Sequence, residues 1–231
     1  YNNNHINKES VPAHLSKMNE ALKLFDTSGT EFPSVAYHNS QPWPIAADGA
    51  GRAMELKHDS AHCGDVANWR NGCVGGSPGA SFQDCNEKFI VTEINYNSGQ
   101  VIDAGTWFEI LNTTNQSINL SGYSIRNKDF ENKITLASGT LLSPGGRLVF
   151  CNNFKKFANF FPTQKVIQLL NFSLDNGGDK ILFYNPNDTL VFSVVFEDTL
   201  AFTNQANGTG YTLDYNNTNN DYSQGINWSI A

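Results

Sequence analysis

An internal repeat relates two long stretches of this 231-residue chain. When the sequence is shifted by 159 residues, residues 14–69 align with residues 173–228 without a gap, and nine of the 56 aligned pairs are identical. Aromatic positions coincide as well: Trp69 aligns with Trp228, and Tyr37 with Phe196. A repeat of this length indicates that both stretches adopt one arrangement of strands and turns.

Strand patterns dominate the sequence between these repeats. Runs of β-branched and aromatic residues, bounded by turn residues, cover 89–96, 107–111, 148–150, 181–184 and 191–196. The last two runs are separated by Asn-Pro-Asn-Asp, which predicts a hairpin. Short strands spaced by turns every 8–12 residues are typical of an all-β sandwich or barrel. Within the run 107–111, alternation places Phe108 and Ile110 on one face.

Helix signals are few. A short helix is predicted at Asn153–Phe161. A weaker helical pattern at Ser16–Leu24 is overruled by the repeat, which predicts strands at Ala21–Phe25 and Phe32–Tyr37 around a turn at Asp26–Gly29. The Gly-x-Gly pairs at 49/51 and 208/210 open no helix, so we interpret them as backbone spacing before strands at Arg52–Leu56 and Tyr211–Tyr215 rather than as phosphate loops.

The two copies are unequal. The second is complete over residues 86–231, whereas residues 1–85 hold only the C-terminal part of a first copy and a Gly/Pro-containing link at 75–80. Residues 86–172, the first 87 residues of the second copy, have no counterpart in the first. Half a sandwich leaves open strand edges and an exposed apolar face. We therefore expect the first copy either to join a missing half upstream or to dock on another surface.

Composition excludes several classes of function. The net charge is −7 with no basic block, so no nucleic-acid partner is expected. No apolar run approaches 18 residues, so no membrane span is expected. The four cysteines lack the paired spacing of a zinc site. Cys63 with Cys73, and Cys85 with Cys151, could form two disulfides of a secreted protein; four free thiols are the alternative.

Several short motifs of residues 86–231 follow one another in an order known from one family. They are Glu93-Ile94-Asn95, Trp107–Asn112, Leu120–Tyr123, Leu142–Gly146 and Ser173–Asp179. The first copy carries the matching later motifs: Trp43-Pro44, Asp48–Gly51, Asn68-Trp69 and Gly75–Gly79. In this order the chain resembles a lamin tail domain of the bacterial, extracellular kind. One departure is Leu200–Thr203, which replaces the Trp-Pro pattern, so a role of Trp43 need not transfer to the second copy.

The resemblance implies an immunoglobulin-like β-sandwich. It also implies an accessory module of a large secreted or surface protein, often beside hydrolase, nuclease or kinase-like domains. The ligand of such modules does not follow from the family. No catalytic residue is expected, because residues 86–231 contain no histidine and no hydrolase signature appears in the chain.

Candidate binding and metal residues are few. Aromatic rings could stack on sugars and a carboxylate could assist them; these binding candidates are Trp43, Trp107, Glu109 and Trp228. Most of the aromatic residues are expected to pack in the core instead. Loop carboxylates suit calcium, with Asp175, Asp179 and Asp188 as possible ligands, and Asn/Asp-rich turns are the alternative. The cluster His58, Asp59, His62, Cys63 and Asp65 is absent from the second copy and is interpreted as a solvated loop.

The sequence thus predicts a non-catalytic extracellular β-sandwich module for adhesion, scaffolding or protein contact, secreted or on a cell surface. Its expected partners are a protein or cell-surface partner, a glycan, and upstream domains of the same polypeptide; no cofactor is expected apart from the calcium candidate. The alternatives are a carbohydrate-binding module and an accessory domain of a secreted hydrolase.

Overall fold

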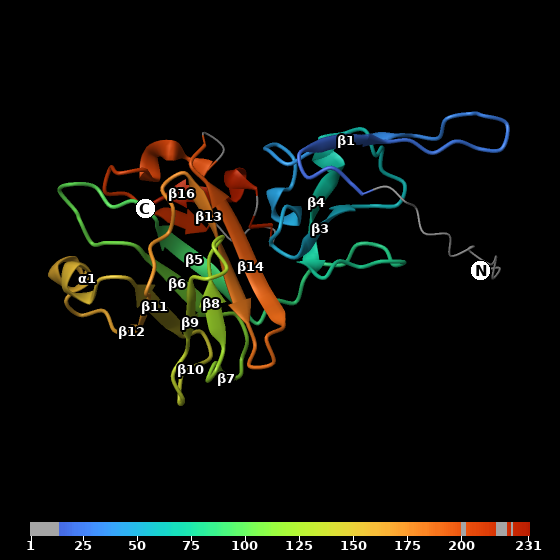
Figure 1. Cartoon of the computed structure of the whole chain (residues 1–231). Helices are drawn as coiled ribbons and strands as arrows, with labels where there is room; N and C mark the ends of the chain where they lie inside the picture. Colours follow the sequence, from blue (N-terminus) through green and yellow to red (C-terminus); the bar gives the residue numbers. More distant parts are fainter. Residues whose placement is uncertain (1–13, 200–201, 216–220, 223) are drawn as a thin grey trace.

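The structure, a computed structural model, describes residues 14–199, 202–215, 221–222 and 224–231. Two facing sheets form the larger part of the molecule (Figure 1). The six-stranded sheet has the order β12-β11-β6-β5-β15-β16 and the four-stranded sheet the order β14-β13-β8-β9. All neighbouring strands are antiparallel except β11 and β12. The predicted all-β, immunoglobulin-like sandwich is therefore confirmed.

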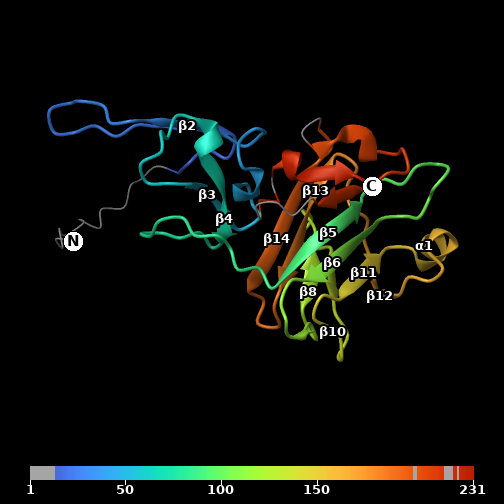
Figure 2. The ribbon, with the colours of Figure 1, turned by 180° about the vertical axis from the view of Figure 1, so that it is seen from behind.

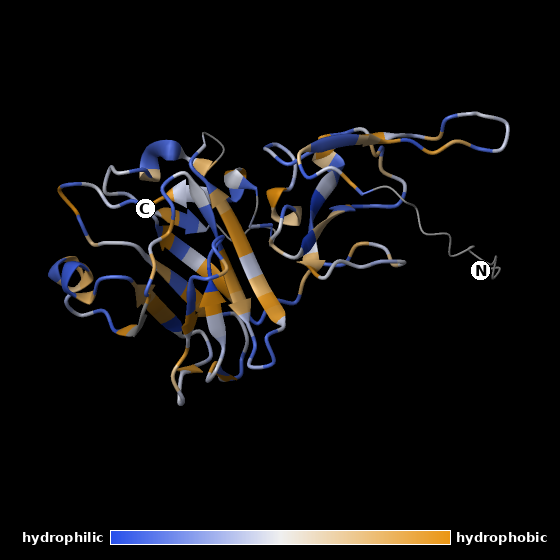
Figure 3. Cartoon of the chain, in the orientation of Figure 1, coloured by the Kyte–Doolittle hydropathy of each residue, from blue (hydrophilic) through white to orange (hydrophobic). Residues whose placement is uncertain are grey.

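The strands follow the sequence patterns closely. The first sheet holds β5 (Phe89–Asn95), β6 (Trp107–Asn112), β11 (Arg147–Cys151), β12 (Val166–Leu169), β15 (Leu213–Tyr215) and β16 (Trp228–Ile230). The second holds β8 (Ser124–Arg126), β9 (Lys133–Thr135), β13 (Gly178–Tyr184) and β14 (Leu190–Glu197), and β7 (Ile118–Asn119) pairs with β10 (Leu141–Leu142) in a separate ribbon. β13 and β14 form the predicted hairpin. Hydrophobic and hydrophilic residues alternate along β6, whereas β14 is hydrophobic along most of its length (Figure 3).

Aromatic side chains fill the space between the sheets. Phe108 and Ile110 are fully buried, as the alternation along β6 predicts. The ring of Phe108 stacks on Phe150 at 5.0 Å, and Phe183 from the opposite sheet meets it edge-on at 6.3 Å. Aromatic pairs of this kind add to the stabilisation that burial of apolar area supplies.

The helix α1 (Phe154–Phe160) lies where the sequence predicts one, and its Phe157 packs on the outer face of the six-stranded sheet. The side chain of Asn153 accepts a hydrogen bond from the amide of Lys156 and caps the helix. Phe157 and Phe161 meet the ring of Trp107 edge-on at 5.6 Å.

A smaller unit precedes the sandwich, and we call residues 14–74 the N-terminal unit. It has two separate two-stranded sheets, of β1 (Asn19–Leu22) with β2 (Val35–His38) and of β3 (Arg52–Leu56) with β4 (Trp69–Val74). Two single-turn 3-10 helices, η1 (Ile45–Ala47) and η2 (Val66–Asn68), precede β3 and β4 respectively. In the sandwich, η4 (Asn204–Ala206) and η5 (Gly225–Asn227) precede β15 and β16 in the same way.

The β1–β2 hairpin differs from its predicted bounds. Its turn lies at Asp26–Gly29 as predicted, with the Asp26 carboxylate accepting hydrogen bonds from the amides of Ser28 and Thr30. Beyond that turn only an isolated bridge joins Phe25 to Glu31, and regular pairing starts at Val35. Pro33 stands between bridge and strand and lacks an amide proton, which explains why the ladder is interrupted there.

Strand registers in the two regions agree after the 159-residue shift. Asn19 pairs with His38, and Gly178 pairs with Glu197. In the other ribbon, Met54 pairs with Asn71 while Leu213 pairs with Ile230. The hairpins of the N-terminal unit therefore have the same register as those that end the sandwich.

A tryptophan anchor occurs in both regions as well. The indole of Trp69 donates a hydrogen bond to the carbonyl of Cys63 at 2.8 Å, and the indole of Trp228 donates to the carbonyl of Tyr222 at 2.9 Å. Both bonds span six residues, so the same loop closes before β4 and before β16.

The N-terminal unit packs against β14, and its β1–β2 hairpin projects away from the sandwich (Figures 1 and 2). Ile45, Ala46 and Ala50 are buried in one apolar cluster with Leu182 and Val195. The unit thus docks on the sandwich, which is one of the two arrangements expected for it.

Candidate functional site

An apolar cleft lies within the N-terminal unit, between the β1–β2 hairpin and the β3–β4 ribbon. Its volume is about 600 Å³. Leu22 and Val35 line it from the hairpin, and Met54 and Trp69 from the ribbon. Trp43 completes one wall, with its ring centroid 6.0 Å from that of Trp69. A concave apolar surface with polar groups at its rim is typical of a binding site.

Residues around the cleft occupy positions that are core in the sandwich. Leu22 is 40% exposed, whereas Ile181, which follows it by 159 residues, is 1% exposed. Leu24 is 67% exposed, and its counterpart Phe183 is fully buried. The same side of the hairpin that is sealed inside the sandwich therefore faces solvent in the N-terminal unit.

The pair Trp43 and Trp69 has a counterpart in the sandwich as well. Phe202 and Trp228 lie at the equivalent positions with ring centroids 6.4 Å apart, and both are buried. Of the segment 200–203 that replaces the Trp-Pro pattern, residues 200–201 lie outside the described residues, and Phe202 and Thr203 stand where the first copy has Trp43 and Pro44. The aromatic wall of the cleft is therefore built like part of a core.

The polar rim of the cleft centres on Tyr37. Its hydroxyl donates a hydrogen bond to the carbonyl of Ser16 at 2.6 Å and lies 3.4 Å from the Glu20 carboxylate. Desolvation and the nearby Glu20 charge raise the pKa of the Tyr37 phenol. This contact holds the segment before β1 against β2 and so fixes one edge of the cleft.

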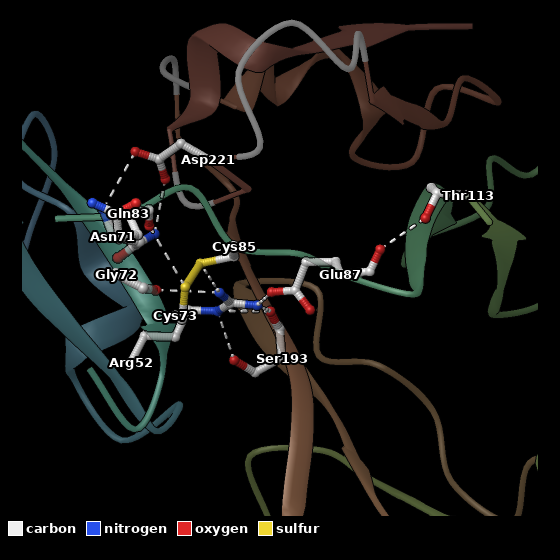
Figure 4. A network of polar contacts seen from close by, with 10 residues as sticks. All are labelled: Arg52, Asn71, Gly72, Cys73, Gln83, Cys85, Glu87, Thr113, Ser193 and Asp221. Carbon is white, nitrogen blue, oxygen red and sulfur yellow. Dashed lines mark hydrogen bonds and ion pairs between the residues drawn. A yellow bond between two sulfur atoms is a disulfide. The ribbon is translucent and has the colours of Figure 1, made fainter. Parts of the chain in front are cut away.

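Arg52 joins the N-terminal unit to the sandwich (Figure 4). The buried guanidinium donates hydrogen bonds to the carbonyl of Ser193 at 2.9 Å and to the carbonyl of Gly72 at 3.2 Å. It forms an ion pair with Glu87 at 2.9 Å and lies 5.7 Å from the ring centroid of Phe192. Because a buried charge is stable only when paired, this network fixes the contact.

Two further contacts support this junction. Asn71 donates a side-chain hydrogen bond to Asp221 at 2.9 Å across the two parts of the chain. Gly51, at a φ of 72°, allows close approach: a Cβ there would lie 2.3 Å from Leu190 Cδ2. The predicted spacing role of the Gly-x-Gly pair thus has a physical basis at this position.

The disulfide pairing differs from the predicted one. Cys73 is bonded to Cys85, while Cys63 and Cys151 are free. The Cys63 thiol donates to the carbonyl of Ser34 at 3.4 Å, in the loop closed by Trp69. Cys151 lies buried in β11 beside Trp107 and Phe157. The segment after β4 turns back at Gly75 and Gly76, both with positive φ, which brings residue 85 to residue 73.

The predicted calcium ligands do not converge. Asp179 begins β13 and Asp188 follows its end, so a strand separates them. Asp188 pairs with Arg126, and Asp175 pairs with Lys128 at 2.9 Å. Within the described ranges, no group of three or more His, Cys, Asp or Glu residues is placed to hold a metal ion. The proposed calcium site is therefore not formed by these three carboxylates.

Asp179 has a structural role instead. Its buried carboxylate accepts hydrogen bonds from the amides of Lys128, Asp175 and Lys180 and from the side chain of Asn127. Asn127 and Lys128 follow β8, Asp175 precedes β13, and Lys180 lies in β13 itself. Both carboxylate oxygens of Asp179 therefore accept hydrogen bonds from the protein and hold these segments together.

Two of the predicted binding aromatics are core residues. Trp107 is buried under α1, and Trp228 is buried against Phe202 and Tyr215. Neither can stack on a sugar, which corrects that prediction. Trp43 alone of the three predicted tryptophans lines the cleft.

Glu109 belongs to a row of carboxylates on the outer face of the six-stranded sheet. It lies opposite Glu93, and Glu93 lies opposite Asp214. Glu109 pairs with Arg147 and accepts a hydrogen bond from Thr92 at 2.7 Å. Burial, followed by the charges of Glu109 and Asp214, raises the pKa of Glu93, although Thr212 donates a hydrogen bond to it at 2.6 Å. Glu109, a predicted binding residue, is thus engaged by Arg147 and Thr92 rather than free for a ligand.

The histidine cluster forms a loop with local partners. His62 Nδ1 accepts a hydrogen bond from the amide of Gly64, and the Asp65 carboxylate accepts one from the amide of Ala67. Asp59 accepts a hydrogen bond from the hydroxyl of Ser81 at 2.8 Å. These bonds agree with the interpretation of the cluster as a loop.

Neither Arg52 nor Tyr37 was predicted from the sequence to have a functional role. Arg52 aligns with Tyr211 in the repeat, and a charged residue at a strand start gave no sign of a buried partner 141 residues away. Tyr37 could have been found, because its alignment with the aromatic Phe196 marks a core position at the rim of an incomplete unit.

Comparisons with known proteins give one finding. The family model described as Lamin Tail Domain matches residues 85–198. No curated protein matches the chain. The matched range ends after β14, while the six-stranded sheet continues with β15 and β16.

Proposed function

Residues 85–198 are a lamin tail domain, and on that premise we propose that the chain is a non-catalytic protein-contact module whose contact surface is the apolar cleft of the N-terminal unit. A lamin tail domain is an immunoglobulin-like domain, a fold that serves many functions through sites added to it. The site therefore carries the argument, not the fold.

The observation that carries this proposal is the exposure of core-type residues around a cleft of about 600 Å³. Leu15 and Leu22, which line the cleft, are 63% and 40% exposed, and further exposed apolar residues follow along the same hairpin: Leu24, Phe25 and Phe32. Clustered exposed apolar side chains mark protein contact surfaces more often than isolated ones do. A protein partner suits this surface better than a glycan, because aliphatic residues such as Leu22, Val35 and Met54 line it beside the two tryptophans.

We place this module outside the cell, secreted or at a surface, within a larger protein that it serves in adhesion or scaffolding. The Cys73–Cys85 disulfide supports an oxidising compartment. The described residues include no helix with the length and hydropathy of a membrane span.

A peptide-display selection on the full chain tests the contact function. We expect peptides that bind the wild-type chain to be lost on Val35→Asp, which puts a charge into the cleft. Val101→Asp is the matched control, since Val101 is an exposed apolar residue of the sandwich. Circular dichroism checks that each variant folds. Failure to enrich any peptide, or peptides that bind both variants equally, would contradict the proposal, and binding on a glycan array would favour the carbohydrate alternative.

A further inference from the structure

We propose that the occupant of the cleft is a β-strand pair of a partner polypeptide, with the apolar alternation of β5 and β6, which completes a second sandwich on the N-terminal unit. This inference rests on the contact function proposed above and specifies its partner.

The sandwich itself shows what covers these positions. In it, Ile94 of β5 lies opposite Leu213, whose counterpart in the N-terminal unit is Met54. The ring of Tyr96 packs 5.1 Å from Phe196, whose counterpart is Tyr37. The counterparts Met54 and Tyr37 both line the cleft. Residues from the first half of the sandwich thus fill the space that the cleft leaves open.

Aromatic contacts extend this correspondence along the hairpin. Phe89 at the start of β5 meets Phe183 edge-on at 5.0 Å, and Phe108 of β6 meets the same ring. The counterpart of Phe183 is Leu24, which is largely exposed. A strand pair shaped like β5 and β6 would therefore bury the exposed side of the hairpin as well as the cleft.

Backbone pairing points to the same occupant. In the sandwich, β15 lies between β16 and β5. The equivalent strand β3 has one partner, β4, among the described strands. β3 therefore presents an edge at the place where the sandwich has β5, and an added strand can pair there through main-chain hydrogen bonds.

A second copy of the chain does not supply this occupant. Each chain carries the β5–β6 half once and the hairpin half twice, in residues 14–69 and 173–228. Exchange of β5 and β6 between copies would fill one cleft and open one sandwich, so no apolar area is gained. Residues 1–13 are mainly polar, with Tyr1, Ile6 and Val11 as their bulky apolar residues, and lack the alternation of β5. Residues 1–231 therefore hold no spare strand pair for the cleft, and the proposed occupant lies outside them.

A synthetic peptide with the sequence of residues 87–98, which covers β5, is the probe. It is added to the full chain, and amide hydrogen exchange and tryptophan emission are measured. We expect saturable binding, slower exchange at residues 53–55 of β3, and a blue shift from Trp43 and Trp69. A control peptide with Val91→Asp and Ile94→Asp should not bind, because both replaced residues are fully buried in the sandwich. The Val35→Asp chain should not bind either peptide.

The outcomes separate this inference from the contact function. If display peptides bind the cleft while the β5 peptide does not, or if bound peptides leave the exchange of β3 unchanged, the strand proposal is wrong and the contact function stands. If neither binds, both fail. A concentration-dependent dimer that disappears on Val35→Asp would assign the cleft to a second copy and overturn the argument from chain stoichiometry.

Discussion

Arg52 illustrates how one side chain can decide the contact between two parts of a chain. Its guanidinium donates to several acceptors at once: the carbonyls of Ser193 and Gly72, the Ser193 hydroxyl and the carboxylate of Glu87. The rings of Phe192 and Tyr222 lie within 5.9 Å of its Cζ atom, so the charge is held against aromatic faces. Only Arg offers a planar fork with this many donors, which makes Lys a poor replacement.

Replacing Arg52 with Met should destabilise the docked arrangement. The change keeps an unbranched apolar stem but removes the guanidinium, so Glu87 and two carbonyls lose their donor, at a cost of about 2–4 kcal/mol. We expect earlier unfolding in urea and faster amide exchange at residues 45–47, which the junction covers. Lys23→Met is the control, because its ion pair with Glu31 is half-exposed and should contribute less than about 1 kcal/mol. Equal unfolding curves for the two variants would show that the junction adds nothing.

Glu93 gives a prediction with a pH dependence. Asp214 and Glu109 flank it on the neighbouring strands, and burial raises its pKa above the ordinary value of 4.5. A raised pKa means that the folded state favours the protonated form. The stabilisation is therefore complete below about pH 4.5 and is lost as the pH rises through the raised pKa.

Glu93→Gln should consequently raise the unfolding midpoint at pH 7 and have no effect below pH 4.5. Gln keeps an oxygen that can accept from Thr212, so the gain reflects removal of the charge; it should be on the order of 2–4 °C. Thermal scans of both proteins from pH 4 to 8 measure this gain in the unfolding midpoint. In the difference between the two pH curves, the effects of carboxylates that both proteins share cancel. Glu109→Gln is the control and should not stabilise, since it loses the Arg147 pair. A gain that is the same at every pH would refute the explanation.

At the scale of elements, the disulfide closes the segment that links β4 to β5. Cys73 is the last residue but one of β4, and Cys85 lies four residues before the start of β5. The bond therefore returns the chain to the N-terminal unit just before it enters the sandwich. Glu87, two residues further, is the ion-pair partner of Arg52. Bond and ion pair together hold the linking segment at the junction.

The double variant Cys73→Ser, Cys85→Ser should lose about 2–4 kcal/mol of stability. The bond joins two cysteines that are 12 residues apart in the sequence. Its removal gives the unfolded chain more conformational entropy, which lowers the free energy of unfolding. Denaturation of the variant, and of the wild type with and without a reducing agent, measures the loss. Cys63→Ser should behave like the wild type, because Cys63 is free. Insensitivity of the wild type to reduction would contradict this expectation.

Most elements could be predicted from the sequence because their signals are local. The alternation along β6, the turn at Asn185–Asp188 and the cap at Asn153 each lie within a few residues of what they determine. The disulfide could not be predicted, because it depends on how far the chain turns back after Gly75. The Arg52 contact with Ser193 joins residues 141 positions apart, and no local pattern encodes it. An exposed apolar surface could be expected from the incomplete repeat. The shape of the cleft could not, because it depends on where Trp43 and Met54 lie in the folded chain.

At the scale of the whole molecule, two environments act on one sequence pattern. The hairpin β13–β14 is packed on both faces, by the six-stranded sheet inside and by the N-terminal unit outside. The hairpin β1–β2 has the same register but no covering sheet among the described residues. Burial of an apolar side chain contributes roughly 1.5–3 kcal/mol to stability. The side chains of β13–β14 make this contribution, whereas the exposed side chains of β1–β2 do not. That difference is the free energy available to a partner strand pair.

This difference leads to a prediction for an extended chain. A second copy of residues 86–172 is placed directly before His14, in place of residues 1–13. Because residue 14 aligns with residue 173, the connection keeps the spacing found in the sandwich. The added strands should cover Leu22, Leu24 and Val35, so we expect a blue shift in tryptophan emission, slow amide exchange in β1 and β3, and a steeper dependence of unfolding free energy on urea.

The control carries Val91→Asp and Ile94→Asp in the added copy only, which should leave the cleft open while the original sandwich stays folded. The new core will be less well packed than the original, because Leu24 replaces Phe183 and Trp43 replaces Phe202, so its midpoint should be the lower of the two. If the extended chain keeps the emission and exchange rates of the wild type, the N-terminal unit cannot accept such strands even when they are tethered, and its exposed hairpin must have another kind of partner.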